Sequence, residues 1–132
     1  MVLVDTSVLI SYLKGATNKA TEKFEKILSD NIPFGINNFI YQELLQGVSS
    51  EKDFKKLKEY LDTQRFYDLK NGRKSYEEAA LMYYKRRKEG VTVSSTIDLL
   101  VAQTAIENNL LLLHHDTDYT HISRVIRELR IY

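Results

Sequence analysis

The chain alternates short apolar runs with longer segments whose apolar residues recur at helical spacing. Strands are predicted at 2–4, 33–36 and 110–113. The last of these is a run of four leucines, as expected for a strand buried on both faces. Two further short strands are predicted at 65–69 and, at the edge of the sheet, at 129–132. Strands that alternate with helices predict an α/β fold with a mostly parallel central sheet.

Helices are predicted where apolar residues repeat every three or four positions between these strands. Thr6 or Ser7 is expected to cap the first helix, Thr17 to open the second, and Asn37 or Asn38 to cap the third. The remaining segments are a charged helix that turns Phe54, Leu57 and Leu61 inward, helices at 75–89 and 96–109, a loop or brief extended piece at 91–95, and a short helix before the last strand.

Composition narrows the class of protein. The 132 residues are 43% hydrophobic, which fits a single domain spanning 1–132. There is no cysteine, which excludes disulfides and thiolate metal sites and suits a reducing cytoplasm. No apolar run approaches the roughly 20 residues that span a bilayer, and the first residues lack the pattern of a signal peptide. We therefore expect a cytoplasmic protein with no membrane partner.

Charge is balanced overall but patterned locally. The chain has 19 Lys and Arg residues and 18 Asp and Glu residues, which gives a net charge of +1. Proteins that bind nucleic acid along their whole surface are usually far more basic. Lys85–Lys88 is nevertheless a basic cluster, and Arg124, Arg127 and Arg130 recur every third residue. The simplest interpretation is a solvated helix face. The alternative is a basic rim around an acidic pocket, with Arg86, Arg87 and Arg124 near the phosphates of a nucleic acid.

Four acidic residues occupy positions that folding alone does not demand. Asp5 and Asp116 each follow a predicted strand, and open α/β sheets bind ligands beyond the carboxyl ends of their strands. Glu43 shares a helix face with Phe39 and Ile40. Asp98 lies in the first turn of an apolar helix. Each has a simpler explanation: a helix cap for Asp5, a rim position for Glu43, a favourable helix start for Asp98 and a turn for Asp116.

Taken together, these acids predict a cation site. Four converging carboxylates repel one another unless some take up protons or a cation neutralises them. Mg²⁺ and Mn²⁺ prefer oxygen ligands and need few of them from the protein. Such ions activate water and stabilise a phosphate under attack, which is the chemistry of a nuclease.

Four stretches of the sequence resemble the PIN-domain family and, within it, the VapC toxins. They are VDTSVLI at 4–10, YQELLQG at 41–47, STIDLLVA at 95–102 and LLHHDTDY at 112–119. They occur in the family's order and near its spacing, and the resemblance covers the whole chain. Each motif alone is weak, whereas the ordered set is specific.

The resemblance implies a three-layer sandwich, with a parallel sheet between helices, that acts as a Mg²⁺- or Mn²⁺-dependent ribonuclease on single-stranded or looped RNA. Asp5, Glu43 and Asp98 correspond to the core acids and Asp116 to the fourth. Asp118 corresponds to a further acid that either binds metal or, as we favour here, orders the loop.

Two further positions carry expectations from the resemblance. The Thr6 hydroxyl lies where it can orient water or a ligand, a role compatible with capping the first helix. Tyr119 departs from the usual phenylalanine and is expected to be a core aromatic.

The resemblance also implies partners: the RNA substrate, a cognate antitoxin whose tail lies in a groove beside the acids, and a second copy in a homodimer. Phe54, Tyr60 and Tyr83 are candidates for such contacts, although core packing is the expected role of each. Two alternatives stay open: a PIN nuclease of RNA maturation, and a non-catalytic PIN-like module that binds RNA or protein.

Overall fold

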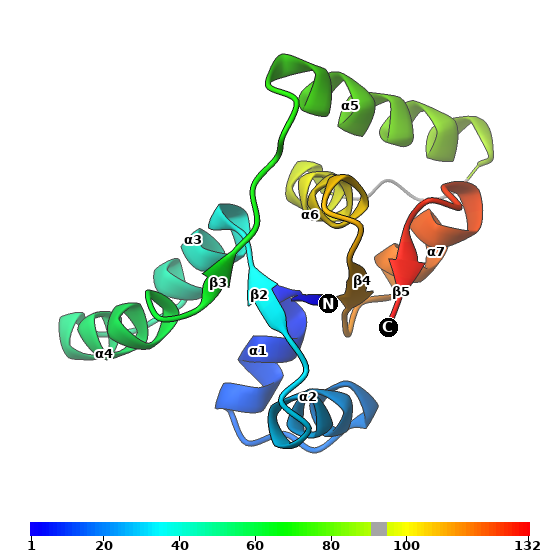
Figure 1. Ribbon diagram of the computed structural model, residues 1–132. Helices are drawn as coiled ribbons and strands as arrows, with labels where there is room; N and C mark the ends of the chain where they lie inside the picture. The colour runs from blue at the N-terminus through cyan, green and yellow to red at the C-terminus, as the bar shows by residue number, and fades with distance from the viewer. Residues whose placement is uncertain (91–94) are drawn as a thin grey trace.

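Five short parallel strands form the centre of the computed structural model, which describes residues 1–90 and 95–132 (Figure 1). The strands are β1 (Val2–Val4), β2 (Phe34–Ile36), β3 (Arg65–Phe66), β4 (Leu111–Leu113) and β5 (Arg130–Ile131). Their order in the sheet is β3-β2-β1-β4-β5, and every pairing is parallel. The prediction of a mostly parallel sheet is confirmed. The piece predicted at 91–95 lies outside the described residues except for Ser95.

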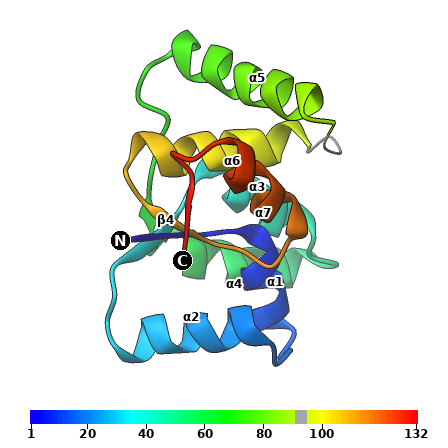
Figure 2. The ribbon, with the colours of Figure 1, turned by 90° about the vertical axis from the view of Figure 1, so that its right-hand side faces the viewer.

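Helices cover both faces of this sheet, as predicted for a three-layer sandwich. They are α1 (Thr6–Leu13), α2 (Lys19–Ser29), α3 (Asn38–Gln46), α4 (Glu51–Leu61), α5 (Arg73–Lys88), α6 (Thr96–Glu107) and α7 (Thr117–Val125). α1 and α2 lie on one side of the sheet, α6 lies on the other, and α5 packs on the outer side of α6 (Figures 1 and 2). In the described parts of the chain, no helix is both long and apolar enough to cross a bilayer.

The core forms around β1 and β4, whose leucines and valines are almost fully buried. Leu110, Leu112 and Leu113 are buried as predicted, whereas Leu111 is half-buried. Successive strand residues face opposite sides of a sheet, so Leu111 lies on the same face as the buried Leu113. The prediction of a strand buried along its whole length is therefore correct except at Leu111, where β4 begins.

Two predictions about helices are wrong in detail. α2 begins at Lys19 because Asn18, not Thr17, caps it: the Asn18 side chain accepts from the Thr21 N–H, and the Thr21 hydroxyl accepts in return from the Asn18 N–H. In α4 only Leu61 is buried. Phe54 and Tyr60 are 40% and 42% exposed, so the inward position predicted for Phe54 and the core role expected of Tyr60 are wrong.

The strand order places β1 beside β4 at the point where the chain changes direction across the sheet. From β1 the chain builds outward through β2 to β3, then returns to add β4 and β5 on the other side. Ligands of open parallel sheets bind beyond the carboxyl ends of the strands at this switch point. The residues that follow β1 and β4, beginning with Asp5 and His114, are therefore placed at the expected position for a functional site.

Candidate acidic metal site

Asp5 directly follows β1, and its carboxylate is buried and accepts three hydrogen bonds. Only 5% of the residue is exposed. It is the N-cap of α1, where Oδ2 accepts from the Ser7 N–H at 3.0 Å and from the Ser7 hydroxyl at 2.6 Å. Oδ1 accepts from the Tyr119 hydroxyl at 2.9 Å. The cap interpretation of Asp5 is thus correct, with Asp5 itself rather than Thr6 or Ser7 in that role. It does not exclude chemistry, because one face of Oδ1 has no partner in this set of bonds.

Ser7 connects the two loops that carry the site. Its hydroxyl donates to Asp5 and accepts from the backbone N–H of His115 at 3.0 Å. This hydroxyl joins the turn after β1 to the turn after β4, which are far apart in sequence. It fixes the distance between Asp5 and the loop that leads to Asp116.

Glu43 reaches the same region from α3. Its Oε1 accepts from the Thr6 hydroxyl at 2.9 Å. Burial raises the pKa of Glu43, the Thr6 hydrogen bond opposes that rise, and the charge of Asp5 adds to it. The Thr6 hydroxyl therefore holds a second acid rather than a helix end, which refines the role expected from the resemblance.

Asp98 lies in the first turn of α6, half-buried, with its N–H donating to the Ser95 hydroxyl at 3.1 Å. Burial, followed by the charges of Asp5 and Asp116, raises its pKa to about 6 despite a hydrogen bond from Tyr119. The carboxylate at this position is thus destabilised when no cation is present. A favourable helix start alone does not produce that environment.

Tyr119, in the first turn of α7, is 1% exposed and its ring packs in the core as predicted. Its hydroxyl, however, donates toward both Asp5 Oδ1 and Asp98 Oδ1, at 2.9 and 3.2 Å. Burial and the two nearby carboxylates raise the pKa of this hydroxyl far above its usual range, so it stays protonated. The hydroxyl role was not predicted, because a tyrosine in an apolar helix pattern gives no sign of what its oxygen meets.

Asp116 and Asp118 complete the acidic group. Asp116 is the N-cap of α7, and its Oδ1 accepts from the Asp118 N–H at 2.9 Å. One carboxylate oxygen from each of Asp98, Asp116 and Asp118 lies within 4.8 Å of the other two. Asp5 and Glu43 lie outside this group of three but border it, Asp5 through Tyr119 and Glu43 through Thr6. Asp118 is therefore placed with the acids, beyond its expected role in ordering the loop.

His114 borders this site and lies outside the group of three acids. Its ring packs against Tyr119 with centroids 5.3 Å apart. Its Nδ1 accepts from the Asp116 N–H at 3.1 Å, and burial lowers its pKa. The neutral imidazole thus orders the turn after β4.

The set of donors suits a hard divalent cation. All five acids offer carboxylate oxygens, which Mg²⁺ and Mn²⁺ prefer, and the raised pKa values of Glu43 and Asp98 reflect repulsion and burial that a cation would relieve. The N-termini of α1, α6 and α7 meet at this site, and each carries partial positive charge. These helix ends offset part of the repulsion and allow the acids to stay together.

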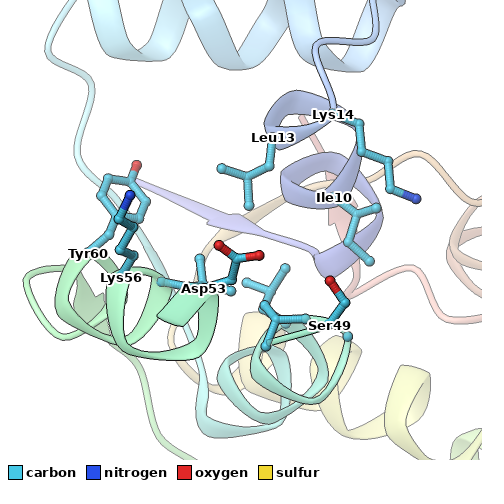
Figure 3. Close-up of a pocket in the computed structure, with 11 residues that line it drawn as sticks. Ile10, Leu13, Lys14, Ser49, Asp53, Lys56 and Tyr60 are labelled. Carbon is cyan, nitrogen blue, oxygen red and sulfur yellow. The ribbon is translucent and has the colours of Figure 1, made fainter. Parts of the chain in front are cut away.

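An apolar groove lies next to this site, between α1 and the α3–α4 pair. Its volume is about 850 Å³, and its lining includes Leu44, which is adjacent in sequence to Glu43. In Figure 3, Ile10 and Leu13 extend from α1 on one side, and Asp53 and Tyr60 line the α4 side. Ile10, Leu13 and Tyr60 are each more than a third exposed, so this surface is open to a partner.

The basic residues fall into two groups. Arg86 is 1% exposed and is part of the packing of α5, so the prediction that it faces RNA is wrong. Arg87 and Arg124 are exposed. The basic end of α5 and the helix α7 lie on the same side of the molecule as the start of α6, where Asp98 is located (Figure 2).

Comparison with known proteins gives a consistent result. The PIN domain matches residues 2–125. Ribonuclease VapC11 of Mycobacterium tuberculosis (strain ATCC 25618 / H37Rv) is 25% identical over 126 residues, which cover 95% of this chain and 93% of that protein. The VapBC2 complex of Rickettsia felis, bound to a DNA fragment from its promoter, contains a similar chain with a TM-score of 0.72 and 18% identity, covering 100% of this chain and 98% of that one.

A second structure, described as a toxin-antitoxin complex from Klebsiella pneumoniae, has a TM-score of 0.70 and 17% identity. The match covers 99% of this chain and all of that one. At these identities the two structures establish the likeness of the fold.

Proposed function

Since the chain belongs to the PIN domain family, as its four motifs predicted, we propose that it is a divalent-metal-dependent endoribonuclease and the toxin of a toxin–antitoxin pair. The observation that carries this proposal is the convergence of Asp98, Asp116 and Asp118 at the switch point of the sheet, with Asp5 and Glu43 beside them. Ribonuclease VapC11, which matches 95% of the chain, is a ribonuclease by name, and this supports RNA as the substrate.

The acids would hold one or two Mg²⁺ or Mn²⁺ ions, with Asp98, Asp116 and Asp118 nearest to one another and Asp5 and Glu43 at the border. When bound, such an ion supplies Lewis acidity, which activates water for in-line attack on a phosphodiester and offsets charge on the phosphate. The chain's own contribution is positional: Ser7 and Tyr119 fix Asp5, and Thr6 fixes Glu43. Exposed Arg87 and Arg124 would contact flanking phosphates.

The test is cleavage of total RNA by the purified protein with Mg²⁺, with Mn²⁺ and with EDTA. We expect discrete fragments that require metal and are absent with Asp98→Asn. Asp30→Asn is the matched control, because Asp30 is an exposed carboxylate that pairs with Lys26 on α2, away from the site. RNA that stays intact with every metal would exclude the nuclease, and binding of RNA without cleavage would favour a non-catalytic module.

We also propose that the apolar groove between α1 and α4 is the binding site of the antitoxin. A structure with a similar fold is a toxin-antitoxin complex, and Leu44, which follows Glu43 on α3, lines the groove. A segment bound there would lie near the acid on α3. Co-purification with the product of the adjacent gene tests this. Leu13→Glu, in the groove, should abolish the complex, whereas Leu81→Glu, on exposed α5, should leave it intact.

The proposal extends to the protein's location and its oligomeric state. We place it in the cytoplasm, where its RNA substrate is found, and as a homodimer of one domain per chain. Light scattering after size-exclusion chromatography measures the dimer directly, and a monomer at micromolar concentration would contradict it.

A further inference from the structure

Tyr119 is the point at which the two halves of the acidic site meet. Asp5 follows β1, whereas Asp98 begins α6, so neither backbone sets the position of the other's carboxylate. Between them lies the Tyr119 hydroxyl, 2.9 Å from Asp5 Oδ1 and 3.2 Å from Asp98 Oδ1. The hydroxyl has one proton and two charged acceptors, so it is shared between them.

The surroundings fix this hydroxyl in place. The Tyr119 side chain is 1% exposed, and the His114 ring packs against it. A buried aromatic ring has few ways to turn, so the oxygen cannot follow the carboxylates if they move. The carboxylates instead align on the hydroxyl. Asp5 is held additionally by Ser7, and Asp98 by a side-chain hydrogen bond from Ser95, so Tyr119 is the residue that joins the two carboxylates.

We propose that Tyr119 is a positioning residue whose hydroxyl holds the Asp5 and Asp98 carboxylates together in a geometry ready for a divalent cation. It touches neither RNA nor the reacting phosphate, because its ring is buried beneath the acids. This inference rests on the proposed metal site and adds to it a residue that is not itself an acid. Hydrogen-bond partners of metal ligands commonly change metal affinity by about 10- to 100-fold when removed.

The experiment is Mn²⁺ titration by calorimetry of the wild type, Tyr119→Phe and Tyr41→Phe. Tyr119→Phe removes only the hydroxyl and keeps the buried ring. Tyr41→Phe is the matched control, since the Tyr41 hydroxyl also donates to an aspartate, Asp62, at 2.8 Å but on an exposed surface away from the site. We expect Mn²⁺ binding about tenfold weaker for Tyr119→Phe and unchanged for Tyr41→Phe.

RNA cleavage gives a second readout. The Mn²⁺ concentration for half-maximal activity should rise about tenfold in Tyr119→Phe, while KM for RNA at saturating Mn²⁺ stays at the wild-type value. A purely structural role would lower the amount of active protein without moving the metal requirement.

A third readout uses the wild-type protein alone. Mg²⁺ binding to the wild type should change the near-ultraviolet tyrosine signal, because the carboxylates bonded to Tyr119 acquire a cation. If Tyr119→Phe binds Mn²⁺ with the same affinity as the wild type, the positioning role is wrong and the proposed metal site is retained. Absence of binding in the wild type overturns both. A tyrosine signal that does not respond to bound Mg²⁺ also counts against the role of Tyr119.

Discussion

Thr6 and Glu43 are joined by a hydrogen bond of 2.9 Å across 37 positions of sequence, and this bond is the link between α1 and the acid on α3. The donor follows Asp5 directly, so one dipeptide supplies an acid and the support for a second acid.

Thr6→Val should weaken metal binding while keeping the fold, since valine has nearly the shape of threonine. Loss of the hydrogen bond removes the interaction that lowers the pKa of Glu43, so that pKa rises further above its ordinary value. We expect about tenfold weaker Mn²⁺ binding and a shift of the pH–activity curve to higher pH, because the metal needs the deprotonated carboxylate. Thr63→Val is the control, since its exposed hydroxyl bonds only neighbouring groups, the Tyr60 carbonyl and the Gln64 side chain, and no acid. An unchanged pH profile in Thr6→Val would contradict this role.

The metal-free protein should lose stability as pH rises through the titration of Asp98. The folded-state pKa of about 6 lies above the value of about 4 for an unfolded aspartate, so the folded state binds more protons between these values. The free energy of unfolding in EDTA therefore falls as pH rises from about 4 through about 6. Urea titrations across this range measure the effect, and Asp98→Asn should flatten it. A wild-type stability that rises over the same interval would show that Asp98 is not the dominant group.

Added metal should reverse that loss above pH 6, because it binds the folded acids. An ion at 100 times its dissociation constant stabilises the folded state by about 2.7 kcal/mol. We expect a higher melting temperature with Mn²⁺ than with EDTA for the wild type and little change for Asp116→Asn. NaCl at the same ionic strength separates coordination of a divalent ion from charge screening.

RNA binding should depend on salt in proportion to the number of basic contacts. Arg87→Gln and Arg124→Gln should each weaken binding of single-stranded RNA and lower the slope of log affinity against log salt by about 0.7. Lys26→Gln is the control, because Lys26 is exposed on α2 at the other side of the sheet. The assay uses Asp98→Asn protein so that the RNA is not cleaved. An equal slope for all three variants would place the RNA elsewhere.

Much of the fold followed from local patterns. Leucines at 110–113 and valines around Leu3 gave the two central strands, because strands covered by helices on both faces need continuous apolar runs. Asp5 and Asp116 were found because each follows such a strand, and Asp98 because it lies in the first turn of an apolar helix. Glu43 was found because it shares a helix face with apolar residues.

The contacts between distant segments were not predictable in the same way. The Tyr119 hydroxyl, the Ser7 bridge to His115 and the Thr6 bond to Glu43 all join residues that only the folded chain brings together. Core packing was the role expected of Tyr60, with contact to a partner as the alternative. Tyr60 lines a groove whose other wall is α1, and helix periodicity does not predict the position of α1 relative to α4.

Asp5 and Asp116 each cap a helix, so substitutions at these positions should inactivate the protein in two different ways. Asparagine caps a helix nearly as well as aspartate, so amide alleles at Asp5 and Asp116 should give inactive protein at normal abundance. Alanine also removes the cap, which costs about 0.5–2 kcal/mol and lowers the steady-state level in the cell. A growth selection that scores only survival would not distinguish alleles that lose catalytic activity from alleles that lower the amount of protein. Immunoblots of the surviving cells would distinguish the two kinds.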